Sequence, residues 1–146
     1  MNIKNIRLRE MIPGDIGQLE KLYLQCRKET FHWIPSETFA LEDFRKDTEG
    51  EWTLVAEIEG KIIGFASVWV QDHFLHHLYI DSQLHSLGVG QALLKRCLTS
   101  KLQKPARLKC VVKNTKACKF YEKQGWEIES TSLKGPMGPF HVYVLK

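Results

Sequence analysis

The stretch "HHLYIDSQLHSLGVGQALLKRCL", residues 76–98, decides the fold. It begins as an apolar, strand-like run and ends as a helix. The helix carries its apolar residues on one stripe: Leu93, Leu94, Cys97 and Leu98. Glycine costs backbone entropy wherever it lies, so Gly88 and Gly90 between the two elements indicate a backbone that must come close to something.

A glycine loop that runs into a helix has one strong chemical use, which is to bind an anion. Unpaired N–H groups and the positive end of the helix dipole point at one spot there. The spacing is neither G-x-G-x-x-G nor that of a P-loop, so the sequence does not favour a dinucleotide or a nucleoside triphosphate. Taken alone, the pattern is explained equally well by a tight turn.

Composition sets the class of protein. The 146 residues are 43% hydrophobic and 26% charged, which is typical of one folded domain over residues 1–146. The net charge of +4 is mild, and the basic group at 101–109 is more typical of a solvated face than of a nucleic-acid stripe. Four cysteines without a C-x-x-C pair favour a reducing compartment and argue against structural zinc. Neither a membrane span of about 20 apolar residues nor a signal peptide is evident. We therefore expect a cytoplasmic protein that binds neither nucleic acid nor a membrane.

Apolar periodicity and turn residues predict the other elements outward from this stretch. On the N-terminal side they first predict a strand at 6–11 and a helix opened by "PGD" at 13–15. A short helix with Ser36 as N-cap follows. Two strands, at 51–58 and 61–70, are then joined by the turn Glu59-Gly60. The central strand spans 73–80 and its helix about 90–102. On the C-terminal side they predict a strand at 106–112, a helix at 115–124 between Asn114 as N-cap and Gly125 as left-handed end, and strands at 126–133 and 141–146.

The resulting order is β-α-α-β-β-β-α-β-α-β-β, a mixed α/β (α+β) fold. The strands between residues 51 and 80 are expected to form an antiparallel meander. The strand–helix–strand unit over 73–112 should make its two flanking strands parallel.

Two motifs carry a resemblance to a known family. The segment 78–94, "LYIDSQLHSLGVGQALL", consists of a strand, a short loop and a sequence close to [RQ]-x-x-G-x-[GA] at a helix start. The segment 109–127, "KCVVKNTKACKFYEKQGWE", fits N-x-x-A-x-x-F-Y-x-x-x-G-[FW]. Together, and at this spacing, they resemble the acyl-CoA-binding and second signatures of the GCN5-related N-acetyltransferase (GNAT) superfamily, whose fold the other predicted elements also match. One departure is His85, which stands where the family has arginine or glutamine.

The resemblance implies a site for acetyl-CoA as co-substrate, without a metal. The loop and helix start would hold its pyrophosphate through backbone N–H groups, and the preceding strand, splayed from its parallel neighbour, would bind the pantetheine arm. The implied cofactor-binding residues are Leu78, Tyr79, Ile80, His85, Ser86, Leu87, Gly88, Val89, Gly90, Gln91, Ala92, Asn114, Ala117, Phe120 and Tyr121.

The implied reaction is direct attack of a primary amine on acetyl-CoA in a ternary complex, which needs no covalent enzyme intermediate. The N–H of Ile80 would polarise the thioester carbonyl, and Tyr121 would act as general acid toward the departing sulfur. Tyr121 could instead be a packing aromatic, and Asn114 only an N-cap.

A general base is also required, because the amine arrives protonated. His76 is the leading residue by resemblance to serotonin N-acetyltransferase-like members of the family. Strand alternation places His76 on the face of Leu78 and puts His77 on the opposite face. A histidine on a half-buried strand is more often a structural hydrogen-bonder. Glu57 and Asp72 are weaker alternatives.

Two other functions stay open, an acyl-CoA-binding regulatory domain without catalysis and a small basic nucleic-acid-binding module. The acceptor, a small-molecule or peptide amine, is shaped in this family by segments that correspond to 28–39 and 132–140, and these carry no reaction-specific motif here. Aromatic residues of the first segment, Phe31, Trp33 and Phe39, either line an acceptor pocket or close the core. We expect a monomer or a homodimer.

Overall fold

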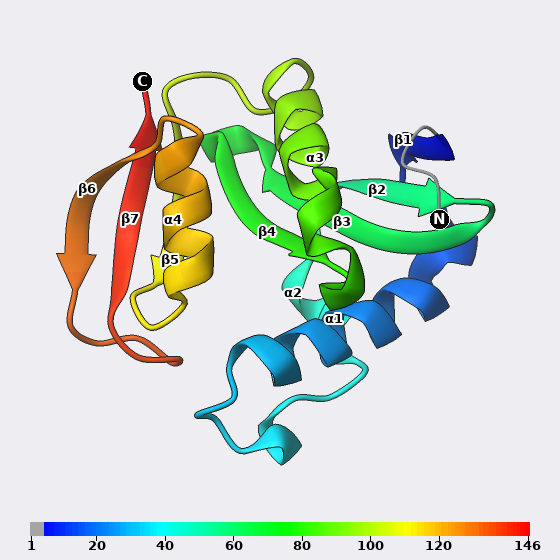
Figure 1. The fold of residues 1–146 in the computed structure, drawn as a ribbon, viewed down its shortest axis with the longest axis horizontal. Helices are drawn as coiled ribbons and strands as arrows, with labels where there is room; N and C mark the ends of the chain where they lie inside the picture. Colours follow the sequence, from blue (N-terminus) through cyan, green and yellow to red (C-terminus); the bar gives the residue numbers. More distant parts are fainter. Residues whose placement is uncertain (1–4) are drawn as a thin grey trace.

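The computed structural model describes residues 5–146 as a seven-stranded mixed sheet with the order β1-β2-β3-β4-β5-β7-β6 and helices on both faces (Figure 1). The strands are β1 (Ile6–Glu10), β2 (Trp52–Ile58), β3 (Lys61–Trp69), β4 (Phe74–Ile80), β5 (Ala106–Val111), β6 (Glu127–Ser132) and β7 (Phe140–Leu145). The helices are α1 (Ile16–Thr30), α2 (Asp43–Asp47), α3 (Val89–Leu98) and α4 (Thr115–Lys123). The predicted order of strands and helices is confirmed.

Two apolar clusters cover opposite faces of the sheet. One joins α1 and α2 to the sheet through residues such as Leu19, Phe44 and Phe65. The larger cluster joins α3 and α4 to the other face, with Leu93 and Trp126 among its members. The central strands are therefore buried on both sides, as their continuous apolar sequence predicts. None of the helices in residues 5–146 is both long and apolar enough to cross a membrane.

The antiparallel meander follows the sequence closely. Glu59 and Gly60 both have positive φ, 50° and 82°, which is the backbone that a two-residue hairpin between β2 and β3 requires. β3 then pairs antiparallel with β4. The predicted hairpin and meander are confirmed.

β4 and β5 are parallel, as predicted, but they pair over only a short length. The paired residues are Phe74 with Arg107 and Leu75 with Leu108, at the beginning of both strands. Beyond Leu75 the strands diverge, and in Figure 1 the head of β4 points away from the group β5, β7 and β6. The sheet therefore opens along the C-terminal half of β4.

A β-bulge interrupts β4 at His76. Ser67 of β3 lies opposite His77 while the next residue, Val68, lies opposite Leu75, so His76 is the extra residue. A bulge breaks the period of two, and the predicted face of His76 is therefore wrong. His77 lies on the face of Tyr79 as predicted, with ring centroids 6.1 Å apart. His76 and His77 turn the same way, with ring centroids 3.8 Å apart.

Two helix boundaries differ from the prediction. Ser36 does not cap the second helix, because residues Ser36–Thr38 form one 3-10 turn and α2 begins at Asp43. The turn ends where Phe39 becomes extended and buries its ring beneath the Arg27 guanidinium, 4.5 Å from the ring centroid. α3 ends at Leu98, not Leu102, because the chain turns there to bury Leu102 completely.

α4 is bounded as predicted. The side chain of Asn114 accepts a hydrogen bond from the N–H of Ala117 at 3.3 Å, so it is an N-cap. Gly125 has φ 96°, the left-handed conformation expected just past a helix end.

Candidate functional site

A cavity of about 660 Å³ lies where the sheet opens. The divergent end of β4, the start of α3, one side of α4 and the C-terminal end of α1 form its walls. Most residues predicted for the cofactor line it: Leu78, Tyr79, Ile80, His85, Gly88, Gly90, Gln91, Asn114, Ala117, Phe120 and Tyr121. The structure thus brings together two motifs that are far apart in the sequence.

Four other residues that were predicted to bind the cofactor do not line the cavity with described side chains. Val89 is fully buried and Leu87 packs against the core, so their side chains support the loop from behind. Ala92 is not among the lining residues. The side chain of Ser86 lies outside the described part of the structure. A role for Leu87, Val89 and Ala92 would therefore rest on their backbone groups.

The N-terminus of α3 lies at the cavity, with Gly88, Gly90 and Gln91 in its lining. Gly88 is the N-cap and has no side chain that could cap the helix, and the first helical bond within the cap region runs from Ala92 N to Gly88 O at 3.1 Å. The N–H groups of Val89, Gly90 and Gln91 precede this bond and have no intrahelical acceptor. Such an end attracts an anion.

The two glycines of the loop differ in how strictly their positions require glycine. Gly88 has φ 79°, a left-handed conformation that side chains rarely adopt, and a Cβ there would meet no atom within 4 Å. Gly90 does not have positive φ, and a Cβ there would touch Phe120 at 3.6 Å. Backbone strain therefore requires glycine at Gly88, whereas a Cβ at Gly90 would make only an ordinary van der Waals contact with Phe120.

The backbone of Ile80 faces the opening of the sheet. The N–H of the next residue, Asp81, bonds to Ile63 O on β3 at 2.8 Å. Because successive residues of a strand direct their N–H and C=O groups to opposite sides, those of Ile80 point away from β3, where β5 has diverged. The Ile80 carbonyl instead accepts from Cys26 Sγ at 3.5 Å and from His85 Nε2 at 2.8 Å.

His85 links the loop to α4. Its Nδ1 lies 3.2 Å from Lys116 Nζ, a group that only donates, so Nδ1 accepts and Nε2 carries the proton given to the Ile80 carbonyl. The positive charge at this place is therefore supplied by Lys116, which lines the cavity with Lys113. Neither lysine was predicted, although both flank Asn114 in the second motif.

Tyr121 lies on α4 with its side chain buried and in the cavity wall. Its ring packs against Phe120 and Trp126, with centroids 5.3 Å and 6.1 Å away. Burial raises the pKa of the phenol above its ordinary value of 10. Tyr121 therefore keeps its proton throughout the neutral and mildly basic range, which suits a proton donor.

The end of α1 forms a wall that the sequence did not predict. Cys26, Glu29, His32 and Trp33 all line the cavity. Trp33 Nε1 donates to Met137 O at 3.0 Å and so ties this wall to the loop between β6 and β7. Burial raises the pKa of the Cys26 thiol to about 12, which leaves it without nucleophilic character at neutral pH. Of the three aromatic residues considered for an acceptor pocket, Trp33 lines the cavity, whereas Phe31 and Phe39 are buried in the core.

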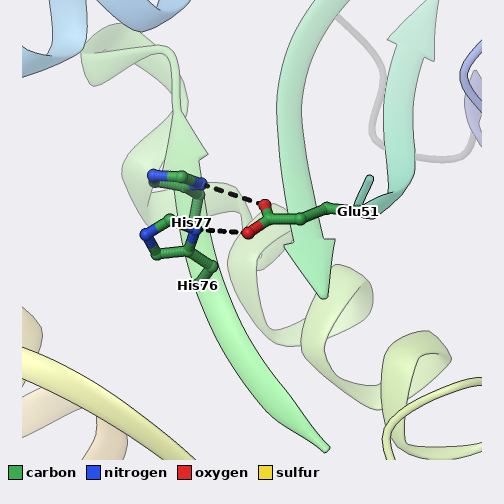
Figure 2. A group of neighbouring side chains, drawn as sticks. All are labelled: Glu51, His76 and His77. Carbon is green, nitrogen blue, oxygen red and sulfur yellow. Dashed lines mark hydrogen bonds and ion pairs between the residues drawn. The ribbon is translucent and has the colours of Figure 1, made fainter. Parts of the chain in front are cut away.

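The histidine predicted as general base lies elsewhere. His76 is not among the residues that line the cavity; it contacts Glu51, with Nδ1 and Oε2 2.5 Å apart (Figure 2). The weaker alternatives are also absent from the lining, and Glu57 is held by Arg9 at 3.1 Å.

Comparison with known families gives one match that covers most of the chain. Residues 16–126 match the pattern of the family described as "Acetyltransferase (GNAT) family". No curated protein matches the sequence significantly.

Solved structures share the fold at low sequence identity. The apo form of YjaB from Escherichia coli has a TM-score of 0.80 and 19% identity, over 95% of this chain and 96% of that one. The PaiA N-acetyltransferase from Thermoplasma acidophilum, solved in complex with coenzyme A, has a TM-score of 0.76 and 19% identity over 96% and 99%. The ribosomal-protein-S18-alanine N-acetyltransferase from Escherichia coli has a TM-score of 0.72 and 16% identity over 96% and 92%.

Proposed function

The chain belongs to the GNAT family of acetyltransferases, and from that premise we propose that it transfers an acetyl group from acetyl-CoA to a primary amine by direct attack in a ternary complex. The observation that carries the proposal is the start of α3, where N–H groups without side-chain caps meet a left-handed glycine at the edge of the cavity. That arrangement fits a phosphate-bearing co-substrate. We further propose that residues 1–146 act as one domain.

The residues present fit coenzyme A in charge and shape. The free N–H groups of Val89, Gly90 and Gln91 would receive the pyrophosphate, and Gly88 leaves open space in front of them. Lys116 would add the positive charge that His85 does not supply. Bound there, acetyl-CoA would supply an acetyl group already activated as a thioester.

The reaction centre would lie against the opened half of β4. The N–H of Ile80 is directed to this side and would donate to the acetyl carbonyl oxygen as negative charge develops on it. Tyr121 would donate its proton to the departing sulfur. Its position in the wall and its raised pKa support this role.

Proton removal from the incoming amine needs a group that faces the cavity. Glu29 and His32 on the wall formed by α1 do so, and we propose them ahead of His76, which has no such position. A carboxylate on this wall would also attract a cationic amine. Glu29 Oε2 accepts from Ser82 Oγ at 3.0 Å, which ties this carboxylate to the turn that follows β4.

Binding and turnover test the proposal in sequence. Calorimetry and thermal shift with acetyl-CoA and with CoA should show 1:1 binding and a raised melting temperature, because the site exists only in the folded chain. Pantetheine, which lacks the phosphates, should bind much more weakly. Absence of binding to both CoA species would refute the assignment of the cavity.

Turnover is then measured as CoA thiol release with a panel of amino acids, polyamines, aminoglycosides and peptide N-termini. Acceleration above hydrolysis by one amine class identifies the acceptor. Tight CoA binding with no acceleration by any class would favour the non-catalytic acyl-CoA-binding domain instead.

A further inference from the structure

The contact of His76 belongs to a cluster of ionisable side chains that the proposed reaction does not use. Glu51, at the entry to β2, faces the two histidines of the bulge, and Figure 2 shows both rings turned toward its carboxylate. Glu51 Oε2 lies 2.5 Å from His76 Nδ1, and Oε1 lies 3.7 Å from His77 Nδ1. The bulge creates this arrangement, since regular alternation would separate the rings.

The carboxylate of Glu51 is buried without a permanent cation. Its side chain is 6% exposed, and within residues 5–146 its ion-pair partners are these two histidines alone. Oε1 has no hydrogen-bond partner in the same part of the chain. A buried anion with an unused oxygen calls for a cation.

The proton of His77 is placed so that Nδ1 carries the lone pair that a metal ion would need. Tyr23 donates its hydroxyl proton to Asp47 Oδ2 at 2.6 Å, so its oxygen accepts from His77 Nε2 at 3.3 Å. Nε2 therefore carries the proton and Nδ1 holds the lone pair, which accepts a hydrogen bond from Ser67 Oγ at 2.7 Å. A metal ion on Nδ1 would replace this hydrogen bond.

We propose that Glu51, His76 and His77 bind one divalent transition-metal ion, zinc in the first place. Their ligand atoms all lie within 4.8 Å of one another. Two ligands of a tetrahedral zinc ion at roughly 2.0–2.2 Å are about 3.3 Å apart, so small side-chain rotations complete the set. Two imidazoles and one carboxylate suit zinc, and the 42% exposed side chain of His76 leaves a route for the ion and for water as fourth ligand.

The Tyr23 and Asp47 contacts complete the site as its outer shell. Metal-bound histidines usually donate their second N–H to an oxygen that fixes the ring. For His77 this oxygen is the hydroxyl of Tyr23. The ion would hold the entry of β2 to the middle of β4. This inference does not rest on the proposed transferase activity, because its readout is metal binding alone.

The test uses the untagged, chelator-treated chain and two probes, Zn²⁺ by calorimetry and Co²⁺ by visible absorption. One equivalent of Zn²⁺ should bind, and Co²⁺ should give the intense bands of a four-coordinate site. Glu51→Gln and His76→Ala should each weaken binding more than about a hundredfold, since even loss of an outer-shell partner costs tenfold or more. Tyr23→Phe should weaken it about tenfold.

His141→Ala is the matched control, because His141 bonds to Thr131 outside the cluster and should leave binding unchanged. Melting temperatures in EDTA show which variants fold. Should Glu51→Gln fail to fold, His76→Ala decides, since that side chain is 42% exposed. Wild-type protein without stoichiometric Zn²⁺ binding, or a His76→Ala protein that binds as tightly as wild type, would overturn the proposal.

Discussion

The two halves of β4 differ in the partners of their backbone hydrogen-bonding groups. The N-terminal half is paired on both sides at Phe74 and Leu75, and the bulge that follows turns two histidines toward a buried carboxylate. Among the strands of residues 5–146, the C-terminal half, Leu78–Ile80, pairs with β3 alone, and its backbone groups on the other side face a cavity. β4 thus contributes to stability where it pairs with β3 and β5, and to ligand binding where β5 has diverged from it. Changes in the first half should affect folding, and changes around the second should affect binding and turnover.

Tyr121→Phe should have the largest effect on turnover, and it should leave the paired half of β4 and the stability of the fold unchanged. The ring and its packing stay while the proton donor is lost, so kcat should fall about a hundredfold with CoA affinity unchanged. Because the pKa of Tyr121 is raised, the wild-type kcat should show no decline from its ionisation up to pH 10. Steady-state kinetics over pH 6–10 and calorimetry measure both quantities. An unchanged kcat would make Tyr121 a packing residue.

Ser67→Ala tests the paired half. Ser67 is fully buried and bonds to His77 Nδ1 at 2.7 Å, so its loss leaves a buried polar atom unsatisfied and should lower the free energy of unfolding by about 2 kcal/mol. CoA affinity should not change. Denaturant unfolding and calorimetry measure the two effects.

Thr53→Val is the control for Ser67→Ala, because Thr53 is its cross-strand partner. The Thr53 hydroxyl is buried and has no hydrogen-bond partner within the described residues. Its removal should be neutral or stabilising. If both variants lose the same free energy of unfolding, the hydrogen bond of Ser67 does not stabilise the fold more than the unbonded hydroxyl of Thr53 does.

Gly88→Val should reduce CoA affinity about tenfold or more by placing a side chain before the free N–H groups of α3. It also strains the backbone, at a cost of about 1–3 kcal/mol in stability. Gly60→Val is matched, since Gly60 has φ 82° in the β2–β3 turn and equally open surroundings. Both variants should lose similar stability, and only Gly88→Val should lose affinity. Equal CoA affinity of the Gly88→Val and Gly60→Val proteins would show that the glycine loop does not bind CoA.

Lys116→Met should give the smallest effect, about a threefold loss of CoA affinity at low salt. The side chain is exposed, so its attraction for phosphate is screened and should fade as ionic strength rises. Lys119→Met, on the same helix but not in the cavity lining, should change nothing. Calorimetry at two salt concentrations compares them, and a loss independent of salt would indicate a packing effect instead.

The turns and helix ends could be predicted from local sequence. Asn114, Gly125 and the tight turn at Gly60 each act within a few residues, so their roles follow from their type and neighbours. The loop at Gly88 is equally local. The lining residues of α1, such as Glu29 and Trp33, could not be predicted, because nothing in their own segment shows which distant strand they will face.

His76 shows where local reasoning fails. Strand alternation assumes an unbroken ladder, and a bulge depends on how β3 registers against β4. A weak signal existed: Leu75 and Leu78 are both apolar, three residues apart, and both pack in the same cluster, which no regular strand allows. The sequence of β4 by itself did not show which residue would be extra.

The sequence by itself determined the order of the elements, the ends of α4 and the glycine loop, since these depend on backbone preferences and on contacts a few residues away. The tertiary structure decided where β4 leaves β5, which way His76 and His77 turn, and which lysine stands beside His85. These depend on pairings between segments tens of residues apart. Their free energy comes from packing and hydrogen bonds that exist only once the whole sheet has formed.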